Sequence, residues 1–330
     1  MTDADLVLEG GGVKGAGLAG ALSAMVERED PYRFRRVAGT SAGAIVASMI
    51  AAGLSAGDLK KVLLDLDFSQ FEDQSPVFKH FKALGEGIGL IFKEGMFKGD
   101  VLHAWIQESL ASKGVRTWGD LKQKDPDSAL PPEQRYKLVV VVSDVSRGRM
   151  LRIPWDCRPL LGIDPDDQSV ADAVRASASI PFFFRPLHMA ANPAVTQGHG
   201  TILCTDGGML SNYPIDIFDR HDGQLARWPT LGVKLSAKCS IADASWDPDA
   251  NDLKLALSLI STMQDAHDQM HVDDPSFFSR TIFVDTTGYK ATDFNLTQAD
   301  KQKLFDAGHA AATKFLQDWD WSAWKAKYGP

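Results

Sequence analysis

Short apolar runs alternate with stretches of helical periodicity along most of the chain. Residues 5–9 predict a strand, and apolar residues then recur every three or four positions over 18–25, as on one face of a helix. The same order returns at 35–53, where a short strand, a serine between glycines and an apolar helix follow one another, with Gly53 as the predicted C-cap. The start of the chain therefore predicts two strand–turn–helix units.

The rest of the chain continues this alternation. Residues 136–145 contain a four-valine run, which is typical of a strand buried on both faces of a parallel sheet, and 147–155 would pair with it as a hairpin. Further strands are predicted at 201–208, 230–237 and 280–286, and helices at 55–68, 100–114, 169–180, 253–270 and from 297 onward, with Ser55, Asp100 and Thr297 as N-caps. We therefore expect one domain over residues 1–330, with its core at 5–316, folded as a three-layer α/β/α sandwich around a mainly parallel central sheet.

Two segments stand outside this alternation. Residues 68–99 are rich in phenylalanine and glycine, and each of their central glycines would cost a helix about 1 kcal/mol relative to alanine, so we expect an irregular segment. The tail at 317–330 places Trp319, Trp321 and Trp324 close together. Terminal packing and an interaction or membrane-touching surface are both open interpretations of this tail.

Composition narrows the function classes. The chain has 330 residues, 44% of them hydrophobic and 24% charged, which allows a sizeable core, and its net charge of −8 argues against a general nucleic-acid binder. Cys157, Cys204 and Cys239 are odd in number and widely spaced, and fit neither a disulfide framework nor a zinc site. The acidic N-terminus does not resemble a signal peptide, and no stretch is long enough to span a membrane. We expect a cytoplasmic protein without a bound metal.

The glycine-rich segment 10–15 allows two kinds of anion site. Gly10, Gly12 and Gly15 satisfy G-x-G-x-x-G between a strand and a helix, which is a weak fingerprint for a dinucleotide. That interpretation also needs a carboxylate at the end of the second strand, and this strand ends in Gly-Thr-Ser at 39–41. We therefore predict no dinucleotide cofactor, and no other cofactor.

The second strand instead supplies a candidate nucleophile. Residues 39–43 read G-T-S-A-G, a match to G-x-S-x-G, which would expose Ser41 on a tight strand-to-helix turn. The helix that follows directs its positive end at this serine and favours developing negative charge. An ordinary tight turn is the alternative. If Ser41 is a nucleophile, the backbone amides of Gly10, Gly11 and Gly12 could bind the oxyanion of an acyl-transfer reaction.

A nucleophilic serine needs a proton acceptor, and Asp206 is the best placed candidate. It ends an apolar strand and is followed by Gly207 and Gly208, at the kind of strand end where sites of open parallel sheets assemble. A turn aspartate is the alternative. An unperturbed aspartate is a poor base at neutral pH, so its pKa would have to be raised by burial. A histidine base is the competing hypothesis, with candidates at His221, His267, His271 and His309, although none lies in a turn that would aim it at a nucleophile.

Together these motifs resemble the patatin-like phospholipase family. GGGVKG at 10–15 resembles its oxyanion motif, GTSAG at 39–43 its nucleophile elbow, and DGG at 206–208 its aspartate motif. The segments at 93–106, 171–186 and 212–214 are also similar to the family, so the resemblance runs from Asp5 to Leu316.

The resemblance implies a Ser–Asp dyad without histidine and esterase or phospholipase A-type activity on acyl lipids. Ser41 would be the nucleophile and Asp206 the general base. Gly10, Gly11 and Gly12 would line the oxyanion hole, and Lys14 would orient that loop. Supporting motif positions are Gly15, Gly39, Gly43, Gly207 and Gly208.

Other outcomes remain open at this point. The same dyad could transfer an acyl group to an acceptor other than water, or the fold could serve as a catalytically silent lipid-binding or scaffold protein. The expected partner is a phospholipid or another acyl ester, with transient contact to a membrane surface and no nucleic acid. Residues 68–99 could form a lid over the site, or simply contribute to the core. Oligomeric state, headgroup and chain length are not predicted.

Overall fold

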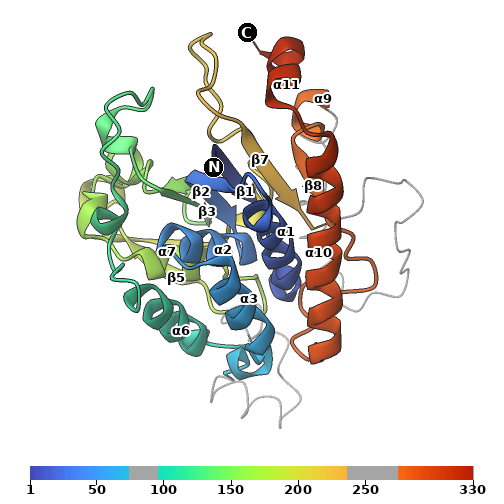
Figure 1. Cartoon of the computed structure of the whole chain (residues 1–330). Coiled ribbons are helices and arrows are strands. Elements are labelled where there is room, and N and C mark those ends of the chain that lie inside the picture. Colours follow the sequence, from blue (N-terminus) through green and yellow to red (C-terminus); the bar gives the residue numbers. More distant parts are fainter. Residues whose placement is uncertain (74–95, 236–273, 330) are drawn as a thin grey trace.

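The computed structural model describes residues 1–73, 96–235 and 274–329. A mixed eight-stranded sheet runs through the centre of the molecule (Figure 1), with the strand order β5-β6-β3-β2-β1-β7-β8 and with β4 paired to β3. The strands are β1 (Thr2–Leu8), β2 (Tyr32–Thr40), β3 (Leu138–Asp144), β4 (Arg149–Ile153), β5 (Leu187–Ala190), β6 (Thr201–Asp206), β7 (Thr230–Lys234) and β8 (Thr281–Phe283).

The middle of the sheet is parallel, as the buried valine run predicted. β3, β2, β1, β7 and β8 pair in parallel with one another in this order, and all seven residues of β3 are buried. The antiparallel pairs lie at the other side of the sheet, where β4 forms the predicted hairpin with β3 and where β6 pairs with both β3 and β5. The α/β fold with a mostly parallel sheet is therefore confirmed.

One edge of β3 is shared by two strands that approach each other from opposite directions. Thr40, the last residue of β2, pairs with Val141, whereas Asp206, the last residue of β6, pairs with the next residue, Val142. Since β4 occupies the opposite edge along Val140–Asp144, β2 and β6 lie end to end on the same edge. Their carboxyl ends therefore meet, although β6 is antiparallel and not part of the parallel set.

Four helices lie side by side in front of the sheet in Figure 1. They are α1 (Gly15–Glu27), α2 (Ala42–Ala51), α7 (Val170–Ser177) and α10 (Gln298–Asp318). The other described α-helices are α3 (Ala56–Asp65), α6 (Asp100–Ala111), α9 (Pro275–Phe278) and α11 (Trp321–Tyr328). The predicted helix at 253–270, which would belong to the crossover from β7 to β8, lies outside the described residues.

Close packing of α1 on α10 depends on glycine. A Cβ atom added to Gly20 would lie 1.9 Å from the carbonyl oxygen of Phe305, and one added to Gly308 would lie 1.9 Å from that of Gly17. No side chain fits at such distances, so the two backbones can approach only because both positions lack a side chain. This contact fixes α10 against the helix that follows the glycine loop.

Several predicted helix ends need correction. Asp100 is the first residue of α6 and not its cap: Gly99 precedes the helix with φ 73°, and the carboxylate of Asp73 accepts from the amides of Gly99, Asp100 and Val101. The helix predicted at 169–180 already ends at Ser177, and the residues before Pro181 form a turn. By contrast, Ser55 and Thr297 accept from the amides of Asp58 and Asp300 as predicted.

The tryptophan-rich tail is helical and packs on the rest of the molecule. Trp324 of α11 donates its indole N–H to the hydroxyl of Ser279 at 2.9 Å, and Trp321 stacks on Trp324 with ring centroids 5.3 Å apart. Trp319 stacks on Phe315 in the last turn of α10. Cys239 and the central part of the 68–99 segment, residues 74–95, lie outside the described residues.

Candidate active site

The turn between β2 and α2 has the geometry of a nucleophile elbow. Ser41 adopts φ 53° and ψ −124°, a conformation that is strained for a residue with a side chain. A Cβ atom added to Gly39 would lie 2.3 Å from the carbonyl oxygen of Gly43, and one added to Gly43 would lie 2.3 Å from that of Leu8. The glycines on both sides of Ser41 are therefore required for the turn to close.

Ser41 and Asp206 meet although they lie 165 residues apart in the sequence. The hydroxyl of Ser41 donates to Oδ2 of Asp206 at 2.6 Å, and both residues are buried, with exposed fractions of 5% and 1%. Oδ1 of Asp206 accepts from the amide of Gly208 at 2.8 Å. Gly207 lies so close to β3 that an added Cβ would be 2.2 Å from the carbonyl oxygen of Val141.

Burial changes the acidity of Asp206. Loss of solvent raises the pKa of its carboxyl to about 7, while the hydrogen bonds from Ser41 and from the amide of Gly208 act in the opposite direction. Among the described residues, no arginine, lysine or histidine shifts this pKa. A carboxylate in such surroundings can exchange a proton near neutral pH, as a general base must.

The carboxyl end of α7 holds both members of the pair in place. The buried hydroxyl of Ser177 accepts from the amide of Ser41 at 2.9 Å and donates to the carbonyl oxygen of Val141 at 2.7 Å. Two residues on, the carbonyl oxygen of Ser179 accepts from the amide of Asp206 at 3.0 Å and from the hydroxyl of Thr205 at 2.7 Å. Sequence reasoning missed these contacts, because the small residues at the end of a predicted helix gave no sign of what they would touch.

The glycine loop lies beside the same pair. Gly10 donates its amide to the carbonyl oxygen of Asn212 at 3.2 Å, and the side-chain amide of Asn212 donates back to the carbonyl oxygen of Gly10 at 3.3 Å. Within the described residues, the amides of Gly11 and Gly12 have no acceptor. Of the three predicted oxyanion donors, Gly10 is therefore engaged in holding the loop, and the next two remain open.

Contacts across the loop explain its glycines. Gly12 has φ 55°, and an added Cβ would lie 1.9 Å from the carbonyl oxygen of Ala291, which also accepts the amide of Val13. Lys14 closes a short 3₁₀ turn that begins at Gly12, and Gly15 starts α1. The positive φ at Gly12 and the backbone packed against it exclude a side chain there.

An apolar pocket opens next to Ser41. Its walls come from the glycine loop, α2, α3, the segment after α3, α6 and the turn after α7. The lining that the described residues provide contains no charged side chain. The lining comprises Gly12, Val13, Gly15, Ser41, Ala42, Ile45, Val46, Leu63, Leu66, Phe68, Phe71, Leu102, Trp105, Ala178, Ile180, Phe184 and Phe294. Phe68 and Phe71 belong to the segment for which a lid was considered; the rest of that hypothesis concerns residues 74–95, which are not described.

The candidate histidines are not brought to Ser41 by the described parts of the chain. His309 lies on α10 beside Glu27, with its ring nitrogen 3.8 Å from the carboxylate, and His221 lines a different cavity. His267 and His271 lie outside the described residues. Across the described ranges, no group of three His, Cys, Asp or Glu side chains could hold a metal ion, and no helix is long and apolar enough to cross a membrane.

The chain is similar to proteins of one family. The sequence model of the patatin-like phospholipases matches residues 6–219. The uncharacterized protein YqhO of Bacillus subtilis (strain 168) is 35% identical over 315 residues, which cover 96% of this chain and 98% of YqhO. The uncharacterized protein R571 of Acanthamoeba polyphaga mimivirus is 24% identical over 309 residues, or 92% of this chain and 90% of R571.

Among solved structures, VipD from Legionella pneumophila matches with a TM-score of 0.51 at 20% identity. The match covers 95% of this chain but 66% of VipD, so the chain spans about two thirds of the length of that protein. At this level of identity the likeness concerns the fold alone.

Proposed function

Because the chain belongs to the patatin-like phospholipase family, we propose that it is a serine acyl hydrolase that cleaves acyl esters of lipids with Ser41 as nucleophile and Asp206 as general base. The observation that carries this proposal is the 2.6 Å hydrogen bond between the two side chains, next to an apolar pocket. The pocket accounts for a preference for acyl chains over charged substrates, because apolar surface is removed from water when a chain enters it.

The reaction begins when the hydroxyl oxygen of Ser41 attacks the ester carbonyl carbon. Its proton passes to Oδ2 of Asp206 as the carbon–oxygen bond forms, and collapse of the tetrahedral intermediate breaks the bond to the alcohol, which takes that proton. An acyl-serine remains. Water then attacks the acyl carbon and gives its proton to Asp206, and Ser41 leaves with the proton as the fatty acid is released.

The oxyanion is best stabilised by the amides of Gly11 and Gly12, together with the positive end of α2. These two amides have no acceptor among the described residues, whereas the amide of Gly10 is used by Asn212. Preorganised donors of this kind contribute on the order of 10²–10³ in rate each. In this proposal Gly10 fixes the position of the loop, and the next two residues provide the donors.

Lipid hydrolysis is tested with phospholipid vesicles and mass spectrometry of the products. The wild-type protein should release fatty acid and lysophospholipid in equal amounts, and a fluorophosphonate probe should label it at Ser41. Ser41→Ala serves as the control and should show neither product nor label. A wild-type protein that is folded but inert to both vesicles and probe would contradict the proposal and favour a silent binding protein.

Ser177 is expected to support catalysis through the backbone of Ser41. Removing its hydroxyl leaves the buried amide of Ser41 without an acceptor, at a cost of about 1–3 kcal/mol, and loosens the elbow. We expect Ser177→Ala to lower kcat on a short-chain ester roughly tenfold or more, with little change in KM.

Ser48 offers a matched control for this variant. It is a fully buried helical serine whose hydroxyl donates to Ile45 in the same helix, and it does not touch Ser41 or Asp206. Ser48→Ala should therefore keep both kcat and KM. A Ser177→Ala enzyme with wild-type kcat, or an equal loss in the two variants, would show that the contact has no role in positioning.

A further inference from the structure

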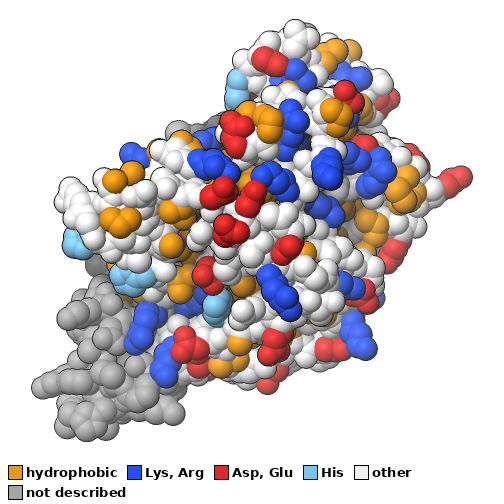
Figure 2. Space-filling view, turned by 90° about the vertical axis from the view of Figure 1, so that its left-hand side faces the viewer, with side chains coloured by type: hydrophobic (Ala, Val, Ile, Leu, Met, Phe, Trp, Pro, Cys, Tyr) orange, Lys and Arg blue, Asp and Glu red, His pale blue; other side chains and the backbone are white. Residues whose placement is uncertain are grey.

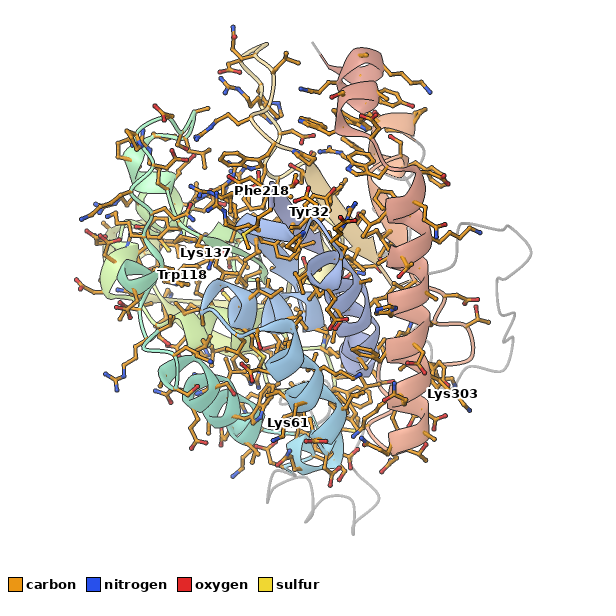
Figure 3. All side chains as sticks on the ribbon, in the orientation of Figure 1. Tyr32, Lys61, Trp118, Lys137, Phe218 and Lys303 are labelled. Carbon is orange, nitrogen blue, oxygen red and sulfur yellow. The ribbon has the colours of Figure 1, made fainter. Side chains whose placement is uncertain are left out.

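A second cavity, of about 290 Å³, lies at the opposite end of the sheet from Ser41. Arg36 on β2 lines it, and Ser41 follows five residues later, which is roughly 16 Å along an extended strand. In Figure 3, Phe218, a wall residue of the cavity, lies near the upper end of the sheet, whereas Lys61 marks α3, a helix that contributes Leu63 to the apolar pocket, near the lower end. The size is at the lower limit of pockets that hold small molecules.

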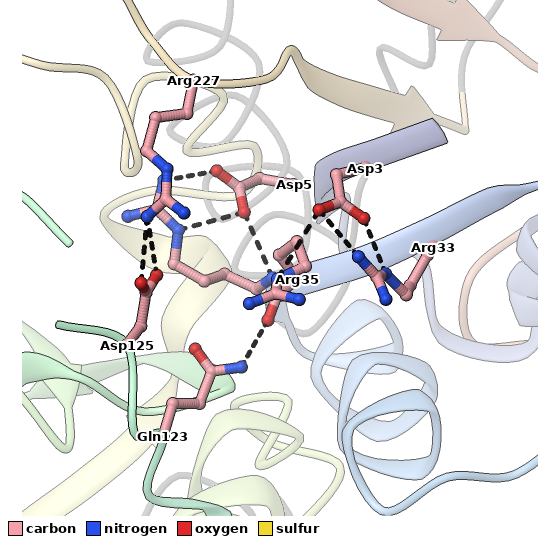
Figure 4. A network of polar contacts seen from close by, with 8 residues as sticks. Asp3, Asp5, Arg33, Arg35, Gln123, Asp125 and Arg227 are labelled. Carbon is pink, nitrogen blue, oxygen red and sulfur yellow. Dashed lines mark hydrogen bonds and ion pairs between the residues drawn. The ribbon is translucent and has the colours of Figure 1, made fainter. Parts of the chain in front are cut away.

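The walls of this cavity come from three distant parts of the chain. β1 and β2 form the floor, the loop at 123–135 forms one side and the segment at 218–230 forms the other. Gln123 ties the loop to β2, because its side-chain amide donates to the carbonyl oxygen of Arg35 at 2.7 Å (Figure 4). The space-filling view in Figure 2 shows basic and acidic side chains interleaved over this side of the molecule.

Every carboxylate in the walls has an arginine of its own. Asp5, which is buried, pairs with Arg36, and Nη1 of Arg227 lies 2.9 Å and 3.0 Å from the two oxygens of Asp125 (Figure 4). The remaining pairs are Asp222 with Arg220 and Asp219 with Arg280. The hydrogen bond from Arg220 lowers the pKa of Asp222 to about 2, so this carboxylate stays charged and occupied by its partner.

Among the described residues, one arginine of the wall has no carboxylate partner. In the parts of the chain that the structure describes, four arginines and four aspartates line the cavity, and Arg280, which is not part of the wall, neutralises Asp219. Arg135 therefore carries an excess positive charge. Its Nε donates to the carbonyl oxygen of Leu130 at 2.9 Å, and no described carboxylate pairs with its guanidinium. This local excess contrasts with a net charge of −8 for the whole chain.

The paired arginines also have N–H groups that their ion pairs with aspartate do not use. Arg227 reaches both oxygens of Asp125 through Nη1 alone, and no described residue accepts from its Nε or Nη2. Arg36 uses Nε and Nη2 on Asp5, which leaves Nη1. Several guanidinium N–H groups can therefore meet an anion in this cavity without breaking any ion pair.

Aromatic rings hold these arginines in fixed orientations. The guanidinium of Arg36 lies 4.6 Å from the ring centroid of Phe218, and that of Arg227 lies 4.5 Å from the ring centroid of Trp228. Stacked guanidinium groups lose less conformational freedom when they bind an anion, and their planar donors match the oxygens of a phosphate. The half-buried Trp228 also offers an apolar face beside the charged side chains of this cavity.

We propose that this cavity binds a small soluble organic phosphate. The phosphate is held by Arg135 and by the unused N–H groups of Arg36 and Arg227, and the organic part lies against Trp228. The free lone pairs of Asp125 and Asp222 accept from hydroxyl or amino groups of the ligand. The cavity exceeds what a lone phosphate ion fills, which favours an ester of phosphate over the free ion.

The proposal is tested by isothermal titration calorimetry on the full chain with adenosine monophosphate, glycerol 3-phosphate and inorganic phosphate. Adenosine and glycerol are the uncharged controls. At least one phosphate ester should bind more tightly than inorganic phosphate and more tightly than its uncharged counterpart, and its affinity should fall as salt is raised. Arg135→Gln should weaken this binding roughly tenfold or more, and Arg135→Lys by a smaller factor.

Arg149→Gln is the matched control, because Arg149 is an exposed arginine of β4 that does not line the cavity. It should bind the ester like the wild type, and so should Ser41→Ala, which separates this proposal from the catalytic one. Arg36 is not a useful target, since its loss would leave Asp5 buried and uncompensated.

Three calorimetric results would overturn the proposal. They are the absence of binding by either ester at millimolar concentration, equal affinity in Arg135→Gln and the wild type, and binding of inorganic phosphate alone. Sedimentation with vesicles that contain phosphatidic acid distinguishes a lipid headgroup from a soluble ligand. Arg135-dependent sedimentation without binding of the soluble esters would also contradict it.

Discussion

Replacing Asp206 by asparagine is expected to lower kcat on a p-nitrophenyl acyl ester by about 10²–10⁴-fold, the usual contribution of a positioned general base. Asparagine keeps the shape of the side chain and can still accept a hydrogen bond from Ser41, but it cannot take the proton that Ser41 must lose. Ser41→Ala removes the attacking oxygen itself, and its loss of activity should be at least as large. Because the two residues act as one unit, the double variant should be no worse than the poorer single variant.

Asp144→Asn provides a matched control for the loss of a buried carboxylate. Asp144 is fully buried on β3, but its partner is Arg147 and not Ser41. This variant should unfold more easily and yet keep its turnover number at a temperature where it is folded. If instead Asp206→Asn kept most of the activity, another base would be needed, and His267 and His271, outside the described residues, would be the first to replace.

Activity should rise with pH through about 7 and then level off. Burial raises the pKa of Asp206 to about 7, and only its ionised form can accept the proton of Ser41. Below this value kcat/KM should fall about tenfold per pH unit, so that about one hundredth of the plateau remains at pH 5. The measurement is a pH–rate profile on a short-chain ester, between pH 5 and pH 9.

The residual activity of Asp206→Asn is the internal control, since it should no longer follow this titration. A flat wild-type profile between pH 5 and pH 8 would contradict the assignment of the base.

The pH dependence of stability should be the opposite of that of activity. The folded state holds the proton of Asp206 more tightly than the unfolded state, so ionisation costs stability as pH rises from about 4 to about 7, on the order of 4 kcal/mol in total. Asp206→Asn should therefore be more stable than the wild type at pH 8.

The parts of the site that could be predicted from the sequence are those formed by residues close together in the chain. The turn at Ser41 depends on glycines within two residues of it, and the cap of α10 depends on two residues that are three positions apart. In both cases the residues that form the sequence pattern are also the residues that make the contact. The meeting of Ser41 with Asp206 depends on strand order over 165 residues. Periodicity reports that a segment is a strand but not which way it runs, and this is why the antiparallel direction of β6 was missed.

Contacts between distant segments account for the remaining gaps. The cap of α6 comes from Asp73, 26 residues before the amide of Gly99, whereas sequence rules look for a cap next to the helix. Ser177 and Asn212 support the site through hydrogen bonds to backbone atoms, and such bonds leave no spacing pattern. The second cavity combines three segments that carry no shared motif.

The end-to-end arrangement of β2 and β6 on β3 makes the separation of nucleophile and base a property of the sheet. This separation is set by two adjacent residues of β3, because Val141 pairs with the last residue of β2 and Val142 pairs with the last residue of β6. A slip of β6 by one residue would turn the carboxylate to the opposite face, and a slip by two would carry it about 7 Å away. Insertions in the surface loops between β4 and β6 leave this strand register unchanged. Evolution can therefore change these loops, and with them the substrate, while the spacing between the nucleophile and the base stays the same.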